Sequence, residues 1–164
     1  MDMERNKLLQ IIAKNADHNI EDLAKILNET PQAVDAEIKK MIDEKIILGK
    51  HTVINWDKEN HEKVLAFIEV GVTPERETGY DKVATRIFKY EEVTDCYLIS
   101  GICDLILIIE GKTMQEIAEF VAMKLAPIDN VKSTATYFVL KTYKHNSLVF
   151  YEDGSKAQER VEIS

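Results

Sequence analysis

Hydrophobic residues recur at helical spacing up to Lys45 of this 164-residue chain, and polar or charged residues fill most of the positions between them. The spacing predicts three helices, over residues 4–16, 19–27 and 31–44. Their apolar faces would meet in a minimal core of Leu8, Leu9, Ile12, Leu23, Leu27, Val34, Ile38 and Met41, with Ala16, Ile20, Ala24 and Ile42 on the same faces. This part of the chain is therefore predicted to form a small three-helix domain.

Two local signals mark the starts of the second and third helices. Asn19 is followed three residues on by Asp22, and Thr30 is followed by Pro31, which favours the first turn of a helix. Two helices joined by a three- or four-residue turn make a helix-turn-helix, whose second helix can enter the major groove of DNA. The same pattern fits a helical hairpin in any small bundle, so the spacing alone leaves both interpretations open.

From Val64 the pattern changes to short apolar segments that alternate with helical ones. It predicts strands over residues 64–73, 93–100, 104–110 and 131–144, and helices over residues 79–90 and 113–125. Thr113 and Glu116 have the spacing of a capping box, in which each side chain accepts from the backbone amide of the other residue. The order βαββαβ is that of a ferredoxin-like sandwich, and the apolar density suggests that a second subunit covers the free face of the sheet.

The predicted fold class is therefore α+β, with an N-terminal winged helix-turn-helix of three helices followed by a ferredoxin-like βαββαβ sandwich. The helix-turn-helix domain is predicted at residues 1–50, a β linker at 51–63, the ferredoxin-like domain at 64–144 and a loosely held polar tail at 145–164. Between Ile46 and Trp56 the β-branched residues, interrupted by Gly49, predict two short strands or one bent strand, as a wing or a linker.

Composition narrows the class of protein. Hydrophobic residues make up 45% and charged residues 30% of the chain, as in globular domains. No apolar run approaches the roughly 18 residues of a membrane span, and we expect no secretory signal because residues 1–7 lead into a charged helix. Cys96 and Cys103 are the only cysteines and the four histidines are scattered, so we expect a cytoplasmic protein with reduced thiols and neither metal nor cofactor.

The net charge of −8 argues against simple attraction to DNA. Residues 1–50 carry 8 Lys and Arg against 10 Asp and Glu, whereas DNA-binding domains are usually basic because phosphate contacts supply much of their affinity. An acidic domain that binds DNA must gather its lysines on one face or bind weakly.

A helix-turn-helix, a β linker and a βαββαβ domain in this order resemble the Lrp/AsnC family of bacterial and archaeal transcriptional regulators. The resemblance covers residues 4–144 and rests on Asn15-Ala16, Leu23-Ala24, the helix with Pro31, Val34 and Ile38, Ile46-Ile47, and the Gly101-Ile102-Cys103-Asp104-Leu105 hairpin. It implies a homodimer formed through the C-terminal sheets, often assembled into tetramers or octamers. It also implies an amino acid or similar small molecule bound between dimers near the Gly-x-x-Asp loop.

The residues of this hairpin agree with such an effector site. Gly101 permits a tight turn and the close approach of a backbone, and Asp104 can accept from an ammonium group. The candidate effector-binding residues are Ser100, Gly101, Ile102, Cys103 and Asp104, with hydroxyls from Thr134 and Thr136. The alternative is a plain turn glycine, an Asp104 that caps its own loop, and threonines that reflect only β propensity.

The chain departs from the family where DNA contacts are expected. The resemblance implies Arg or Lys at the positions of Asp35, Ala36 and Glu37, and Arg at that of Asp17. Carboxylates repel phosphate, and among base edges they accept only from the amino group of cytosine. The predicted DNA-contacting residues are Thr30, Gln32, Ala33, Ala36, Lys39, Lys40 and Lys50, with His51 beside Lys50 in the predicted wing. The two lysines of the third helix also fit a plain solvated face.

Three functions fit these residues. The leading one is a DNA-binding regulator whose dimer presents two third helices to a roughly palindromic site and whose assembly responds to an effector. The second is an enzyme, because sirohaem decarboxylases resemble this architecture. Against it, the C-terminal domain shows no nucleophile–base pair, phosphate loop or paired catalytic carboxylates, and Arg76, Arg86, His61 and His145 are far apart in sequence. The third is a sensor or assembly partner that no longer binds DNA.

Overall fold

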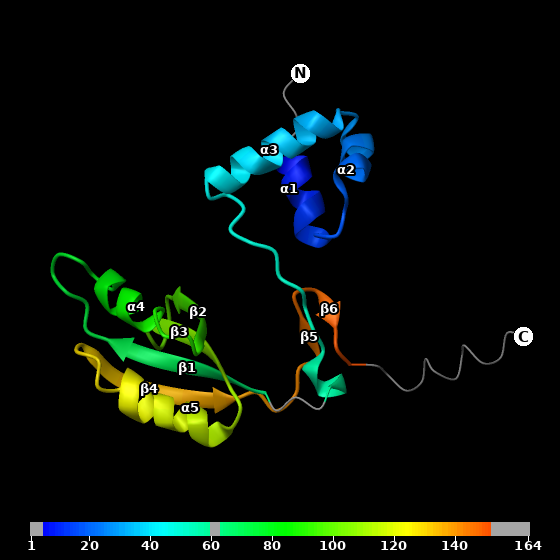
Figure 1. The fold of residues 1–164 in the computed structure, drawn as a ribbon. Coiled ribbons are helices and arrows are strands. Elements are labelled where there is room, and N and C mark those ends of the chain that lie inside the picture. The colour runs from blue at the N-terminus through cyan, green and yellow to red at the C-terminus, as the bar shows by residue number, and fades with distance from the viewer. Residues whose placement is uncertain (1–4, 60–62, 152–164) are drawn as a thin grey trace, which may run out of the picture. The chain divides into compact units, whose positions relative to one another are not determined.

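The computed structural model describes residues 5–59 and 63–151 of the chain. The chain divides into two compact units, residues 1–53 and 54–164. The first unit contains α1 (Arg5–Lys14), α2 (Ile20–Leu27) and α3 (Pro31–Asp43), which follow one another through short turns (Figure 1). The predicted three helices are confirmed, although α1 ends before Ala16, which is exposed.

Both predicted helix starts in this unit are confirmed by their capping hydrogen bonds. The Asp22 amide donates to Asn19 Oδ1 at 2.7 Å, and the Ala33 amide donates to Thr30 Oγ1 at 3.2 Å, with Pro31 in the first turn of α3. The turn between α2 and α3 begins at Asn28, whose left-handed φ of +55° ends α2.

The core of the first unit lies between the three helices, as predicted. Leu8, Leu23, Ala24, Val34 and Met41 are buried in it, and Leu9, Ile12, Leu27 and Ile38 pack against it. Ile42 is the exception, because 48% of its surface is exposed although its spacing predicts the inner face of α3. The inner stripe of α3 therefore follows Val34, Ile38 and Met41 only.

The predicted β wing and β linker are not present in this structure. α3 ends at Asp43, and Lys45 shortly after it has a left-handed backbone conformation. Residues 46–55 then form no strand, and a 3₁₀ turn at Trp56–Lys58 follows. A strand needs a neighbouring strand to receive its backbone hydrogen bonds. No strand of the described residues pairs with this segment, so its β-branched residues remain extended or irregular.

The second unit contains the predicted βαββαβ fold. The strands are β1 (Val64–Val72), β2 (Val93–Leu98), β3 (Leu105–Gly111) and β4 (Val131–Phe138). They form one antiparallel sheet in the order β2-β3-β1-β4 (Figure 1). The helices are α4 (Asp81–Ile87) and α5 (Met114–Phe120), and a π turn at Val121–Leu125 continues α5.

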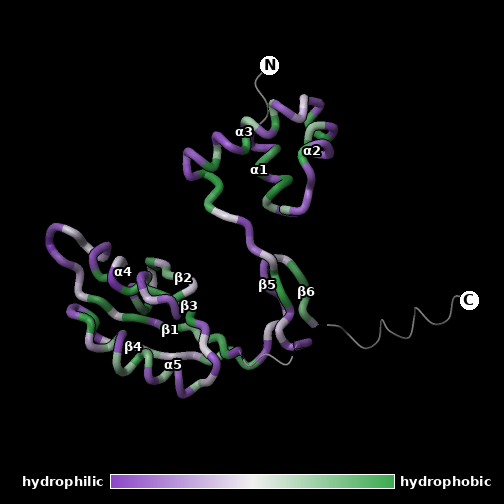
Figure 2. Tube along the Cα trace, viewed as in Figure 1, coloured by the Kyte–Doolittle hydropathy of each residue, from purple (hydrophilic) through white to green (hydrophobic). Residues whose placement is uncertain are grey.

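Both helices cover the same face of the sheet. The buried core joins one face of the strands to the inner faces of the helices, through Ala66, Ile68, Val70, Val72, Leu105, Leu107, Ile109, Val83, Ile87, Ile117, Phe120, Leu125 and Ile128. Figure 2 shows hydrophobic stretches along β1, with hydrophilic residues in the loop before α4. The other face of β1 carries Phe67, which is 40% exposed, so within this chain β1 is buried on one face only.

The capping box at the start of α5 is half confirmed. The Glu116 amide donates to Thr113 Oγ1 at 3.0 Å, as expected. The Glu116 carboxylate, however, accepts from the amide of Lys112 at 2.7 Å and not from that of Thr113. The Glu116 carboxylate therefore caps the amide of Lys112, two residues before α5 begins.

The last predicted strand and the tail need correction. β4 ends at Phe138 and not at residue 144. It pairs with β1, which begins at Val64, and the Val139 amide already donates to the Leu65 carbonyl, so β1 offers almost no further residues to pair with. The chain then forms a small hairpin of β5 (Lys144–His145) and β6 (Leu148–Val149), around Asn146 and Ser147 with φ of +46° and +67°. The first part of the predicted tail is therefore folded, and residues 152–164 of it lie outside the described residues.

Two features are absent from the described residues. None of their helices is long and apolar enough to cross a membrane. Within the same residues, no group of three or more His, Cys, Asp or Glu side chains has the geometry to hold a metal ion.

We expect Ile68→Ala to lower the free energy of unfolding by about 2–5 kcal/mol, because Ile68 is fully buried at the centre of β1 and its truncation leaves a cavity. Met123→Ala is the matched control, because 77% of that side chain is exposed and the change should stay below about 0.5 kcal/mol. Chemical denaturation at one protein concentration measures both. Equal losses in the two variants would contradict this position of the core.

Candidate DNA-binding surface and effector loop

The outer face of α3 presents the predicted DNA-contacting residues to solvent. Gln32, Lys39 and Lys40 are exposed along the helix, Thr30 is exposed at its cap, and Ala33 and Ala36 are accessible to different degrees between them. Lys50 and His51 are exposed in the irregular segment after α3, so they do not form a wing here. The accessible residues among these therefore follow one another from Thr30 to Lys40, and Lys50 is separate from them in the chain.

Both acidic departures on α3 are paired inside the domain. Asp35 accepts from the Lys39 ammonium group at 2.7 Å, one helical turn further on. Glu37 lies 2.9 Å from Nε of Arg5, at the start of α1. Asp17 lies exposed in the turn between α1 and α2. The carboxylates expected to repel phosphate from α3 are thus partly compensated by neighbouring cations.

The ion pair with Asp35 also makes the Lys39 ammonium group less available to phosphate. The hydrogen bond that Lys39 donates to Asp35, and then the charge of that carboxylate, raise the pKa of the Lys39 ammonium group. A lysine already held by a carboxylate must give up or share that partner to reach phosphate. Lys40 makes no ion pair within the described residues, so it is the more available cation of the two.

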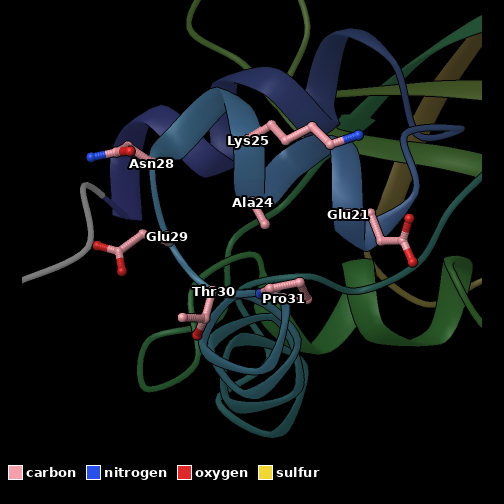
Figure 3. Close-up of a pocket in the computed structure, with 7 residues that line it drawn as sticks. All are labelled: Glu21, Ala24, Lys25, Asn28, Glu29, Thr30 and Pro31. Atoms are coloured by element: carbon pink, nitrogen blue, oxygen red, sulfur yellow. The ribbon is translucent and has the colours of Figure 1, made fainter.

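A shallow hollow lies at the turn between α2 and α3 (Figure 3). Its lining consists of Glu21, Ala24, Lys25, Asn28, Glu29, Thr30 and Pro31. Figure 3 shows Thr30 and Pro31 at the start of α3, with the carboxylate of Glu29 on the preceding turn. Because the lining holds two carboxylates and one lysine, it does not favour an anion, and phosphate contact is better served by the lysines of α3.

The predicted effector loop lies between β2 and β3. Residues 98–102 are all exposed, and Ile102 is 100% exposed. A Cβ atom placed on Gly101 would meet no atom within 4 Å, and Gly101 does not have a left-handed φ. Neither the turn nor packing within this chain therefore requires glycine here, contrary to the tight turn expected from the sequence.

Asp104 anchors the end of this loop to β1. Its Oδ2 accepts from the Val72 amide at 2.7 Å, and its own amide donates to the Val70 carbonyl at 3.2 Å. A hydrogen bond with the Asp104 carboxylate, followed by its charge, raises the pKa of Tyr80. The Asp104 carboxylate therefore caps an amide of β1, 32 residues earlier in the chain, and not its own loop as the alternative predicted.

Thr134 and Thr136 lie on β4, opposite Val70 and Ile68 of β1. Residues directly opposite in a sheet share a face, so both threonines lie on the helix-covered side and are half-buried. Thr134 and Asp104 flank Val70 from opposite sides, Thr134 from β4 and Asp104 from the start of β3, so β1 lies between them. Thr136 lies two residues further along β4.

Tyr80 and Glu75 are not identified as site residues by the sequence. Helical spacing predicts that the ring of Tyr80 packs against the core, as it does. It does not predict the hydrogen bond between the Tyr80 hydroxyl and Asp104. Glu75 accepts from Lys82 at 3.0 Å and from Asn130 at 2.9 Å, and so holds the loop that carries Tyr80. Lys82 lowers the pKa of this carboxylate. No local spacing signals these pairs.

Known proteins are similar to this chain in sequence and in architecture. A family model described as the Lrp/AsnC ligand binding domain matches residues 65–149. The uncharacterized HTH-type transcriptional regulator YugG of Bacillus subtilis is 40% identical over 148 residues, which are 90% of this chain and 89% of that protein. Regulatory protein AsnC of Haemophilus influenzae is 27% identical over 130 residues, which are 79% of this chain and 85% of that protein.

A solved structure shows the same fold. Transcriptional regulator NMB0573 of Neisseria meningitidis, determined as a complex with L-methionine, has a TM-score of 0.69 and 23% identity. The alignment covers 88% of this chain and 93% of that one.

We expect Asp104→Ala to lower the free energy of unfolding by about 1–3 kcal/mol, because the buried Val72 amide loses its acceptor. Asp104→Asn keeps an oxygen acceptor and should lose less. Asp129→Ala is the control, because that side chain is 85% exposed and the change should stay below about 0.5 kcal/mol. Denaturant unfolding that finds Asp104→Ala as stable as the parent would remove Asp104 from the anchoring role.

Proposed function

Because this chain belongs to the Lrp/AsnC family of transcriptional regulators, we propose that it binds specific sites on double-stranded DNA in the cytoplasm through α3 and responds to an amino acid or similar small molecule. The observation that carries the proposal is the capped α2–turn–α3 unit, whose outer face is exposed and in which the α3 carboxylates Asp35 and Glu37 have cationic partners. Such a helix can enter the major groove, where Gln32 has the hydrogen-bonding groups to read adenine.

The open face of the sheet supports a homodimer as the DNA-binding form. The strand registers put Leu65, Phe67, Tyr97, Ile106, Ile108 and Tyr137 on this face. Phe67, Tyr97 and Tyr137 remain at least 40% exposed in the single chain. A second sheet packed on this face would remove these rings from water. Two subunits related by a two-fold axis would present two copies of α3 to a roughly palindromic site.

The effector is proposed to bind at the loop between β2 and β3, with further subunits completing a tetramer or octamer. Ser100, Gly101, Ile102 and Cys103 would face it, Asp104 would receive an ammonium group, and Thr134 and Thr136 would supply hydroxyls. Support comes from the unfilled space around Gly101 and from the L-methionine complex of the regulator from Neisseria meningitidis. For such a ligand to regulate DNA binding, it must bind one assembly of subunits better than another.

Lys39→Ala/Lys40→Ala should weaken binding to a DNA fragment from upstream of the protein's own gene. The plot of log affinity against log salt should also become shallower, by about one for each phosphate that the protein no longer touches. Lys40→Ala alone should account for most of the change, because Lys39 is already paired with Asp35. Titrations at several salt concentrations measure both quantities. An unchanged affinity and an unchanged slope would remove these lysines from the interface.

Amino acids of different side-chain classes should differ in how far they raise the melting temperature of the protein, and the effector should raise it most. Asp104→Asn should abolish this rise while keeping the parental fold without ligand, since its amide cannot neutralise an ammonium group. Thermal unfolding with a panel of amino acids measures the effect. Equal stabilisation of parent and Asp104→Asn would count against the proposed role of Asp104.

A further inference from the structure

Lys40 lies between two carboxylates on the surface of α3. Glu37 precedes it by three residues, and Glu44 follows it by four. Side chains at these spacings are neighbours on a helix and form ion pairs readily, as Asp35 and Lys39 do in the same helix at 2.7 Å. Yet Lys40 pairs with neither carboxylate in the described part of the chain, and its side chain is exposed.

Arg5 of α1 accounts for this difference. Its guanidinium group meets both carboxylates, with Nε 2.9 Å from Glu37 Oε1 and with Nη2 donating to Glu44 Oε2. Of these two contacts, the one with Glu44 is a hydrogen bond, whereas the one with Glu37 is an ion pair without hydrogen-bond geometry. A guanidinium group carries several donors on one planar group and can therefore meet two carboxylates at once. The three side chains are 35%, 23% and 40% exposed, so this cluster is partly shielded from water.

We propose that Arg5 is a positioning residue for DNA binding, because it holds Glu37 and Glu44 away from Lys40 and leaves that ammonium group for phosphate. The inference rests on the proposed function and identifies a residue outside α3 that sets the charge of its outer face. The distances involved are comparable to the electrostatic screening length, since a helix with its side chains is about 10–12 Å across and the Debye length at 0.1 M salt is about 10 Å. Arg5 need not touch DNA for this effect.

The test compares four proteins on the upstream DNA fragment at about 50 mM salt, where phosphate contacts dominate affinity. In Arg5→Met the two carboxylates become free to pair with Lys40, so affinity should fall about 3- to 10-fold and the salt slope by about one, the change expected when a single lysine leaves its phosphate. Arg5→Met/Glu37→Gln/Glu44→Gln should recover the parental affinity and slope although it restores no ion pair. Glu37→Gln/Glu44→Gln with Arg5 intact should bind at least as tightly as the parent.

A double-mutant comparison isolates the route through Lys40. If Arg5 acts by freeing Lys40, Arg5→Met should weaken binding much less in a Lys40→Ala background than in the parent. Arg86→Met is the matched control, because it removes an arginine paired with Asp129 at 3.2 Å in the other compact unit and should leave affinity unchanged. Circular dichroism and thermal unfolding verify that each variant is folded.

The outcomes separate the inference from the proposed function. If the triple variant is folded but does not recover DNA binding, the role of Arg5 is structural. This result would overturn the inference and leave the proposed function standing. Parental affinity in Arg5→Met would overturn it as well. If the parent itself binds no duplex DNA at low salt, the proposed function fails, and the inference with it.

Discussion

The second unit depends on the pairing of β1 with a strand on each side. Ile68 of β1 lies opposite Leu107 of β3 and opposite Thr136 of β4, and this register decides which face every neighbouring side chain occupies. It directs Ile68 and its alternate neighbours to the helices and leaves Phe67 on the open face. The same register brings Asp104 and Thr134 to opposite sides of Val70 at one end of the sheet. The core, the open face and the place of the proposed effector loop therefore all depend on the pairing of β1.

Charge pairing has a comparable role in the first unit. Exposed ion pairs add only about 0–1 kcal/mol each to stability, so Arg5–Glu37 and Lys39–Asp35 contribute little to holding the helices together. Their consequence is the distribution of charge on α3. Asp35 reduces what Lys39 offers to phosphate, whereas Arg5 occupies the carboxylates beside Lys40. An acidic helix-turn-helix domain can thus present a cation where DNA is proposed to bind.

Much of the fold follows from local signals in the sequence. Helical spacing located Leu8, Leu23, Val34 and Met41 in one core, the Asn19 and Thr30 caps marked two helix starts, and the alternation after Val64 indicated the βαββαβ order. These predictions succeeded because a helix is determined by residues close together in sequence, and a strand by the apolar side chains on its covered face. The errors and omissions concern features that depend on distant partners. Residues 46–55 have strand-forming side chains but no neighbouring strand among the described residues, and β4 stops where β1 has no further residues to pair with it. The bond from the Val72 amide to Asp104 joins residues 32 apart, and the contact between Arg5 and Glu44 joins residues 39 apart, so neither has a local pattern.

DNA recognition through α3 is tested most directly by a titration of duplex DNA from upstream of the protein's own gene, at low and near-physiological salt, with and without a panel of amino acids. We expect saturable binding that persists near physiological salt, weakens with a Lys40→Ala substitution and shifts with a particular amino acid. A folded dimer that binds no such DNA even at low salt would contradict this expectation, and would mean that α3 does not serve DNA recognition in this protein.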